Sequence, residues 1–575
     1  MDKNAIPSRQ TSPHVLPQDE DPLTTQRVRR LPAAVRPTPR IAVSMPAEFG
    51  SQLPESLAST LGWLSAPMRM LAQVPQLEEL GVEILNANFR DIVMLGDSED
   101  APIASVLAST FPPAAAWPKF RVLASTMPER IRALERNLDI KRTLFLVVGQ
   151  SRLKVETAAQ LDFFLDRVRA RAAAPPGMSF VAIANSGSPL EEIARRERFR
   201  RVFINSVNAF GLSSPFSYFG LVPAALLGMD VGALLERTVA SMHESVNDTL
   251  PYRYSGVKLG VALAALKRAG RDKIHFVLSP QIRALGLWIS RLIANSGAGI
   301  VPVFDEPPIA VERYGDDRAF VCIRYKDSRS AGLEKMVEAV KQGRYPTIEI
   351  GLEDKLDLGV EFLRWEEAAA TLTLALGLKS RIEIEPDDQG APDFSSLDDI
   401  GSGSSAAEPL VTDGELSLFC GESVRGALKD ARSLADTMSS FFDLSRPGGY
   451  LAVSAFVAPS PAVDREIAAL RRAVAERRGI ATVCSYETTI AWDCSRAADQ
   501  GERGLFLQIS QDHRELVSIP GRDYDFASLN TAWQRAEFEA LEKKGCRVMR
   551  IHLGGEDPIG ALTKLRELLI PTAVR

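Results

Sequence analysis

Short runs of β-branched and other apolar residues alternate with longer helical stretches along most of this chain, and this alternation constrains its fold. Each run has the length of a strand, and each stretch between runs is long enough to connect two parallel strands. The pattern therefore predicts βαβ units on parallel sheets, in two successive sets that are followed by a third α/β segment.

The predicted elements have the following bounds. The strands of the first set are Asp91–Leu95, Arg142–Val148, Ser179–Ile183 and Arg201–Ile204, with helices over Ala158–Ala172 and Ser188–Arg198. The strands of the second set are Ile274–Leu278, Gly299–Val303, Ala319–Ile323 and Thr347–Ile350, with helices over Ser279–Ser296, Ala331–Gln342 and Asp357–Leu376. The strands of the closing segment are Gly449–Phe456, Leu505–Ile509 and Val548–His552.

Two segments lack the alternation. Residues 1–50 contain eight prolines, with five arginines and no acid between Arg27 and Arg40, so we expect a disordered arm. The arm has two interpretations, a solvated tail or a docking segment for an acidic partner. Residues 380–414 are acidic and rich in Gly and Ser, which predicts a linker. The predicted domains are therefore 51–245, 246–379 and 415–575.

The composition excludes several classes of protein. A net charge of −5 gives no general attraction to nucleic acid, and no apolar stretch is long enough to span a bilayer. The five cysteines form no CxxC pair and the five histidines form no metal-ligand cluster, so neither a disulfide framework nor a metal site is predicted. The polar N-terminus lacks an apolar signal segment, so we expect a cytoplasmic protein with no cofactor and no membrane partner.

Several stretches resemble the blocks of one enzyme family, in the same order along the chain. They are LGWLSAPMRM (61–70), SYFGLVPAALLGMDVGALLER (217–237), YGDDRAFV (314–321), DLGVEFLRWE (357–366) and GLFLQIS (504–510). These stretches are similar to the phosphoglucose isomerase half of the bifunctional transaldolase/phosphoglucose isomerase proteins. The resemblance implies an α/β protein with two tandem sugar isomerase domains (flavodoxin-like, three-layer αβα, parallel sheet), followed by a C-terminal α/β domain.

The resemblance also implies a reaction, the interconversion of glucose 6-phosphate and fructose 6-phosphate. That reaction needs a base that moves a proton between C1 and C2, a cation that stabilises the enediolate, and a phosphate anchor. Where the family has Gly-Met-Gly-Gly-Ser-Ser after its first strand, this chain has Gly96–Ala101, which reads GDSEDA. Three acids at this position would satisfy the helix dipole and repel a phosphate, so we expect a capped helix start. The alternative is a reshaped ligand site.

The loop after the second predicted strand aligns with the family's phosphate loop, Ser-Ser-Lys-Ser-Gly-Thr-Thr-Leu-Glu-Thr. Ser151, Glu156 and Thr157 match this pattern, whereas Arg152 and Lys154 replace a Gly and a Thr. Because Arg and Lys both bind phosphate well, the candidate phosphate ligands are Ser151, Arg152, Lys154 and Thr157. Glu156 is a candidate substrate contact. The alternative is an ordinary solvated turn.

The positions that carry the catalytic base and the stabilising cation in the family hold other residues here. Asn295 stands where the family's Glu-Ser-x-Gly-Lys motif has its catalytic Glu, and an amide does not titrate near neutral pH. Leu212 stands where the family has the Arg that helps to stabilise the enediolate. Loss of a general base alone typically lowers the rate by a factor of ~10² to 10⁴.

Three hypotheses from different classes remain. In the first, the chain is an inactive isomerase homologue that acts as a scaffold or regulatory partner in sugar-phosphate metabolism. In the second, it is a sensor that binds a sugar phosphate, and in the third it is still an aldose–ketose isomerase with altered residues. The first is favoured because substitutions occur at several active-site positions together. The sequence does not identify a protein partner, and it does not determine whether the chain forms a homo-oligomer.

Overall fold

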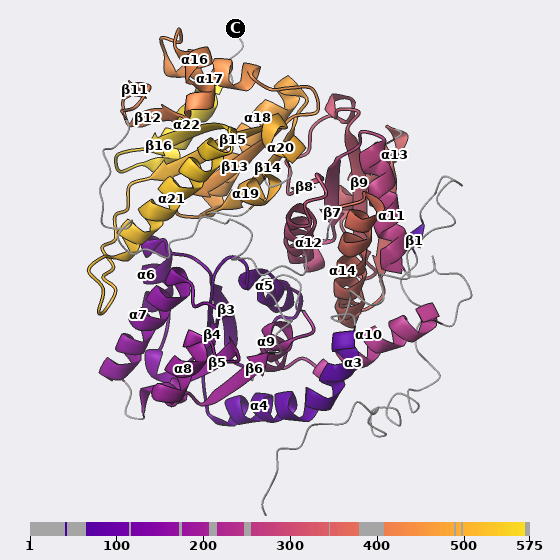
Figure 1. The fold of residues 1–575 in the computed structure, drawn as a ribbon, viewed down its shortest axis with the longest axis vertical. Coiled ribbons are helices and arrows are strands. Elements are labelled where there is room, and N and C mark those ends of the chain that lie inside the picture. Colours follow the sequence, from indigo (N-terminus) through magenta and orange to yellow (C-terminus); the bar gives the residue numbers. More distant parts are fainter. Residues whose placement is uncertain are drawn as a thin grey trace, which may run out of the picture. The chain divides into compact units, whose positions relative to one another are not determined.

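Three sheets organise the part of the chain that the computed structural model describes (Figure 1). The described residues are 41–42, 65–113, 117–171, 175–205, 215–246, 255–343, 345–378, 408–487, 490–495 and 498–569. All of them belong to a single unit of contacts that spans Thr38–Arg575.

The first sheet is parallel, with the strand order β3-β2-β4-β5-β6. Every residue of β2, β4 and β5 is buried, because helices cover both faces of the sheet, and these central strands are apolar except for Asp91, Thr143 and Asn185 at their ends. The strands are β2 (Asp91–Leu95), β3 (Lys119–Leu123), β4 (Thr143–Val148), β5 (Phe180–Asn185) and β6 (Arg201–Asn205). The helices of this part are α3 (Ala66–Met70), α4 (Val74–Asn86), α5 (Ala101–Thr110), α6 (Pro128–Arg136), α7 (Val155–Arg171), α8 (Pro189–Arg196), α9 (Tyr218–Leu226) and α10 (Val231–Val246).

The second sheet has the order β1-β10-β9-β7-β8, and only its edge strand β1 (Ile41–Ala42) is antiparallel. Strand β1 pairs with the edge strand β10, which offers unpaired backbone groups. The sequence predicts disorder for residues 1–50, and this prediction is wrong for Ile41 and Ala42. The other residues of the arm lie outside the described residues. The remaining elements are β7 (Lys273–Leu278), β8 (Val301–Phe304), β9 (Arg318–Tyr325), β10 (Thr347–Leu352), α11 (Ser255–Arg268), α12 (Arg283–Asn295), α13 (Ala331–Gln342) and α14 (Leu358–Ala375).

The third sheet has six strands in the order β11-β12-β16-β15-β13-β14. Strands β13 to β16 are parallel, and β12 pairs antiparallel with β16. The strands are β11 (Val411–Asp413), β12 (Leu416–Cys420), β13 (Tyr450–Phe456), β14 (Ala481–Tyr486), β15 (Gly504–Gln511) and β16 (Arg547–Leu553). The helices are α16 (Glu422–Leu428), α17 (Leu434–Asp443), α18 (Pro461–Arg478), α19 (Ile490–Ser495), α20 (Ala498–Arg503), α21 (Phe526–Lys543) and α22 (Pro558–Leu569).

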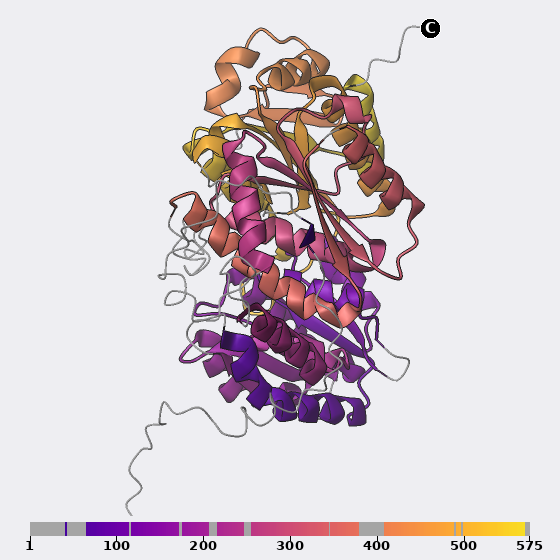
Figure 2. The ribbon, with the colours of Figure 1, turned by 90° about the vertical axis from the view of Figure 1, so that its right-hand side faces the viewer.

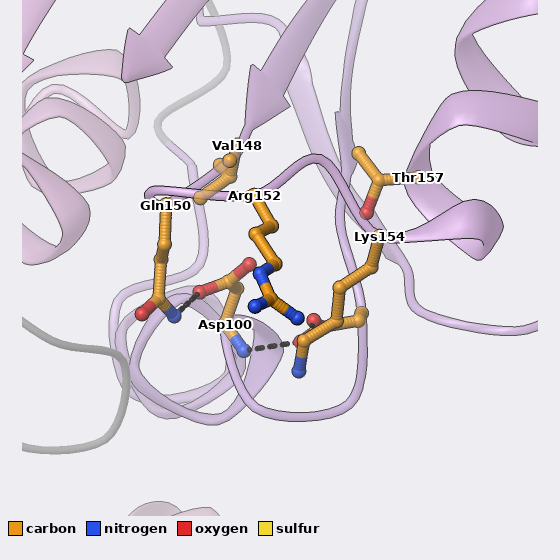
Figure 3. Close-up of a pocket in the computed structure, with 8 residues that line it drawn as sticks. Asp100, Val148, Gln150, Arg152, Lys154 and Thr157 are labelled. Atoms are coloured by element: carbon orange, nitrogen blue, oxygen red, sulfur yellow. Dashed lines mark hydrogen bonds and ion pairs between the residues drawn. The ribbon is translucent and has the colours of Figure 1, made fainter. Parts of the chain in front are cut away.

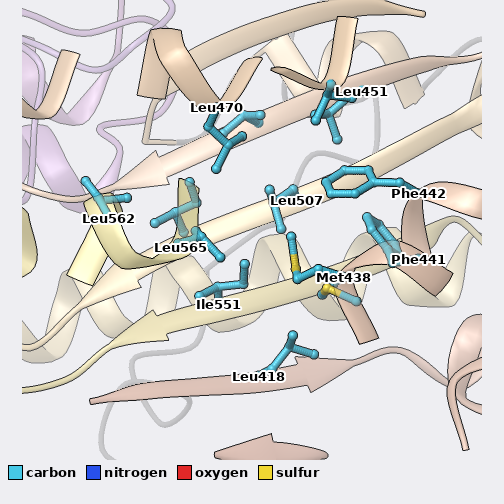
Figure 4. Close-up of a cluster of buried hydrophobic side chains, with 14 of the residues drawn as sticks. Leu418, Met438, Phe441, Phe442, Leu451, Leu470, Leu507, Ile551, Leu562 and Leu565 are labelled. Carbon is cyan, nitrogen blue, oxygen red and sulfur yellow. The ribbon is translucent and has the colours of Figure 1, made fainter. Parts of the chain in front are cut away.

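Helices lie on both faces of the third sheet (Figure 2), and its side chains alternate between two cores, one of which is drawn in Figure 4. Leu451 and Leu507 pack with residues of α17, α18 and α22 on one face, where Phe441 is fully buried. Tyr450 and Phe506 pack on the other face with residues of α19 and α21. Successive residues of a strand point to opposite faces, so one strand serves both cores. The third segment is therefore also a three-layer αβα arrangement.

All three sheets share one strand order. Counted along the chain, their parallel strands lie in the order second, first, third, fourth, and the first sheet adds a fifth strand. This is the doubly wound, flavodoxin-like order, in which ligands bind beyond the carboxyl ends of the first and third strands. The predicted tandem parallel α/β sheets are thus confirmed, and the closing segment repeats their topology.

A cluster of buried charges joins the second sheet to the third. The carboxylate of Asp272 accepts hydrogen bonds from Lys273 Nζ at 2.6 Å, Gln500 Nε2 at 2.9 Å and Arg503 Nη1 at 3.1 Å. Lys273, which is fully buried, also donates to the carbonyl oxygen of Gly448. Asp272 is therefore the nearer of the two carboxylates that neutralise this buried cation, because Asp317 Oδ2 lies 3.6 Å from Lys273 Nζ.

The loop between β15 and α21 joins the third segment to the first sheet. Its Val517 and Ile519 are buried, together with Phe526 at the start of α21, in the apolar core that α6 and α7 form with the first sheet. Arg522 pairs with Asp162 of α7 at 2.9 Å. Residues near the C-terminus thus complete the core of the first sheet.

Replacing Asp272 by Asn should lower the free energy of unfolding by about 3 kcal/mol, because the buried Lys273 then keeps only the more distant carboxylate of Asp317. Burial tends to raise the pKa of Asp272, but Lys273, Lys267 and Gln500 together outweigh it and lower this pKa below 3.8, its usual value. The difference between the wild type and the variant should therefore be full near neutral pH and shrink as the pH falls through the folded-state pKa.

Urea-induced unfolding of both proteins at neutral pH and at acidic pH checks this prediction. The matched control is Asp316→Asn, because the Asp316 side chain is exposed and only its carbonyl oxygen accepts a hydrogen bond, from Arg271. Equal losses of stability in the two variants would contradict the assigned role of Asp272.

Candidate functional site

The loops that follow β2 and β4 meet at the topological switch point of the first sheet. They form a small pocket (Figure 3), lined by Asp97, Asp100, Val148, Gly149, Gln150, Arg152, Lys154 and Thr157. The space between these side chains holds about one water molecule. The candidate phosphate loop therefore lies where a doubly wound sheet binds its ligand, but the pocket is too small for a sugar phosphate.

The side chain of Asp97 stabilises the turn that follows β2. Asp97 Oδ1 accepts hydrogen bonds from the backbone N–H groups of Glu99 at 2.7 Å and Asp100 at 3.0 Å. The carbonyl oxygen of Asp97 accepts the N–H of Ala101, the first residue of α5. The sequence predicts a capped helix start, but the N-cap of α5 is Asp100, whose side chain accepts no hydrogen bond from the helix. The side chain of Asp97 instead accepts the N–H groups of the turn that precedes the helix. These N–H groups are not available to an anion.

Lys154 lines the pocket and forms ion pairs with two acids of the neighbouring turn. Its Nζ lies 2.9 Å from Asp97 Oδ2 and 2.7 Å from Glu99 Oε2, and 27% of its side chain is exposed. Burial tends to lower the pKa of Lys154, but the carboxylates of Asp97, Glu99 and Glu156 outweigh it and raise this pKa well above its usual value. Lys154 is therefore charged, and the acids of the neighbouring turn already neutralise it.

Burial raises the pKa of two further acids of the site, Asp100 and Glu156. Asp100 is buried and accepts a hydrogen bond from Gln150 Nε2 at 2.9 Å. Burial, and next the charge of Asp97, raise the pKa of Asp100 well above its usual value. The same two causes raise the pKa of Glu156 to about 8, and Glu156 Oε2 is buried without a hydrogen-bond partner in the described part of the chain.

The other candidate phosphate ligands differ in exposure. Ser151 and Arg152 are exposed, and the Nδ2 of Asn185 donates to Ser151 Oγ at 3.4 Å. Thr157 is buried in the first turn of α7 and lines the pocket with Arg152. The structure thus brings Arg152, Lys154 and Thr157 to one pocket, whereas Ser151 and Glu156 lie beside it.

Asn295 is the last residue of α12 and is half-buried. One turn earlier, the buried Arg291 donates to the carbonyl oxygen of Ser98, and its Nε lies 3.5 Å from Asp493 Oδ2 in α19. Helix α12 therefore packs against the acidic turn of the first sheet and against the third segment. Leu212, the other substituted catalytic position, lies outside the described residues.

Sequence analysis missed Arg291 and Asp493. A single charge within the apolar stretch Gly286–Ala294 was the signal for Arg291, since a buried helix rarely carries a charge without a partner. Nothing in the sequence indicated Asp493, because its partners come from distant segments.

Charge decides what the pocket can bind. Four acids (Asp97, Glu99, Asp100 and Glu156) face two cations (Arg152 and Lys154) within the site. Because burial favours the neutral forms of Asp100 and Glu156, Asp97 and Glu99 balance the two cations, so a phosphate group would meet no net positive charge. In the described part of the chain, no group of three His, Cys, Asp or Glu side chains is arranged to hold a metal ion. No described helix combines the length and apolar character that crossing a membrane requires.

Comparisons with known proteins place this chain near one group of enzymes. A glucose-6-phosphate isomerase from Thermus thermophilus is 29% identical over 198 residues, which are 33% of this chain and 46% of that protein. A probable glucose-6-phosphate isomerase from Methanococcus maripaludis is 25% identical over 193 residues, which are 32% of this chain and 43% of that protein. The chain thus spans less than half the length of these relatives. No protein-family model matches it.

Among solved structures, a glucose-6-phosphate isomerase from Chlamydia trachomatis is similar with a TM-score of 0.48 and 14% identity, covering 57% of this chain and 72% of that chain. The relatives found by sequence bear out the family resemblance, over about a third of the chain.

Replacing Glu156 by Gln should raise the free energy of unfolding near pH 7 to 8 by roughly 1–3 kcal/mol. The pKa of Glu156 is about 8 in the folded chain against 4.5 as its usual value. The unfolded chain therefore releases this proton first, and the associated stability is full below pH 4.5 and is lost as the pH rises to about 8. The gain from Gln should vanish near pH 4.5.

Denaturant unfolding at pH 4.5 and pH 8 measures this difference, with Glu192→Gln as the matched control on the exposed face of α8. A variant that is no more stable than the wild type at pH 8 would mean that Lys154 keeps Glu156 ionised.

Proposed function

We propose that this chain, a relative of the glucose-6-phosphate isomerases, does not catalyse their reaction and acts instead as a scaffold or regulatory partner in sugar-phosphate metabolism. One observation carries the proposal. The cation of the candidate phosphate loop, Lys154, is held between Asp97 and Glu99 in a pocket that has room for about one water molecule.

The electrostatics of that pocket support the loss of the phosphate anchor. Two opposite unit charges at 4 Å attract each other by about 4 kcal/mol near a protein surface. A phosphate that approached Lys154 would have to displace two carboxylates that lie closer than 3 Å to its Nζ. It would also approach the charge of those displaced carboxylates. Both costs oppose the binding of a sugar phosphate.

The position of the catalytic base supports the same conclusion. Asn295 offers an amide there, and the neighbouring cation, Arg291, already interacts with Ser98 and Asp493. An amide does not accept a proton at neutral pH, so the enediolate route lacks its first step at this position.

A sugar-phosphate sensor is the second candidate function. It is favoured by Arg152, whose exposed guanidinium lines the same pocket and has the forked geometry that suits phosphate oxygens. A sensor of this kind would bind fructose 6-phosphate without turnover, and Arg152→Ala would abolish that binding.

The proposal predicts no conversion of fructose 6-phosphate to glucose 6-phosphate above the buffer rate. The measurement is a spectrophotometric assay coupled to glucose-6-phosphate dehydrogenase. The chain should be purified from a host that lacks its own glucose-6-phosphate isomerase, because traces of that enzyme would imitate activity. The enzyme from Thermus thermophilus serves as the positive control.

Turnover that disappears in both Lys154→Ala and Glu156→Gln would contradict the proposal and assign an altered isomerase mechanism to this site. Turnover that survives both substitutions would point to a contaminant. The partner role is tested with the immobilised chain, which should retain enzymes of sugar-phosphate metabolism from a lysate of its source organism, whereas the heat-unfolded chain should not.

A further inference from the structure

We infer that Asp97 and Glu99 serve as an internal anion that occupies the place of a phosphate beside Lys154, so that the pocket is a latent site for phosphate monoesters. The inference rests on the proposed function, because it explains why a site of this ancestry would not bind its ligand. It also goes further, since it states that the side chains suited to a phosphate remain and that two carboxylates occupy the space beside them.

The position of the two carboxylates is the first argument. Lys154 lies in the loop after β4, and both acids lie in the turn after β2, so the three side chains meet across the switch point. Their oxygens lie 2.9 and 2.7 Å from Nζ, the distances of charge-assisted hydrogen bonds. Two oxygens from separate residues thus hold the ammonium as two oxygens of one phosphate group would.

The rest of the cradle is the second argument. Thr157 remains at the start of α7, a helix of 17 residues, and its side chain lines the pocket. Arg152 lines the opening from an exposed position. A hydroxyl and two cations suited to a phosphate therefore still surround the place that the carboxylates fill.

The charge count is the third argument. Burial favours the neutral forms of Asp100 and Glu156, so the carboxylates of Asp97 and Glu99 balance the cations of Arg152 and Lys154, and neutralising these two carboxylates leaves the two cations in excess. The same change releases Lys154 from both of its ion pairs. Removing these two charges should therefore turn a pocket with no net positive charge into one that attracts phosphate.

The test is isothermal titration of inorganic phosphate, sulfate and fructose 6-phosphate into the wild type and the Asp97→Asn, Glu99→Gln double variant. Asn keeps the oxygen that accepts the N–H groups of Glu99 and Asp100, so the turn should stay intact. We expect no heat of binding for the wild type at millimolar ligand, and at least ~10-fold tighter binding in the double variant. A preference for fructose 6-phosphate over inorganic phosphate and sulfate would identify a monoester site.

Three further variants make the result decisive. Adding Lys154→Ala to the double variant should abolish the gain, and Glu192→Gln, an exposed charge on α8, should produce none. Glu99→Gln alone leaves Asp97 and its turn unchanged and should give a smaller gain, which covers the case in which the double variant does not fold.

A folded double variant that binds phosphate no better than the wild type would overturn the inference, and so would a gain that persists without Lys154. The proposed function fails by a different result, turnover in the wild type. Absence of turnover together with absence of any gain would leave the proposed function standing and remove only the latent site.

Discussion

A charge removed from water needs its counter-charge within reach, and this chain meets that requirement by bringing distant segments together. Lys273 is fully buried and is neutralised by Asp272, which also binds α20 of the third segment. Arg291 links α12 to the turn after β2 and to α19. Lys154 links the loops that follow β2 and β4 within the first sheet. Each of these links is an ion pair that cannot lose one partner at small cost, and the second and third sheets also share an apolar cluster that contains Val301 and Tyr450.

How far sequence predicts this fold depends on how completely each strand is buried. Strands β2, β4 and β5 could be predicted from composition, because helices on both faces make all but one position of each strand apolar. Strand β3 was missed, since its sequence KFRVL is largely half-exposed and mixes charge with apolar residues. Strands β12 and β14 were missed as well. The common strand order of the three sheets lies in contacts between segments far apart in sequence, which periodicity does not report.

The candidate site shows the same division between local and distant information. Alignment with the family's phosphate loop indicated Lys154 and Thr157, and both do line the pocket. The acids of the turn after β2 were expected to cap a helix, but Asp97 binds the N–H groups of the turn itself and the N-cap Asp100 makes no side-chain cap. That Asp97 and Glu99 also reach Lys154 could not be predicted, because Glu99 and Lys154 are 55 residues apart in sequence and meet only across the sheet.

The loop between β15 and α21 has a consequence for the synthesis of the protein. Val517, Ile519 and Phe526 belong to the core that covers α6 and α7, yet they emerge from the ribosome long after those helices. At ~5–20 residues per second, this delay is on the order of tens of seconds. During that interval the N-terminal sheet has an open apolar flank, and a chaperone or a neighbouring chain has time to contact it. The core of the first sheet can therefore be completed only after residues 517–526 have been synthesised.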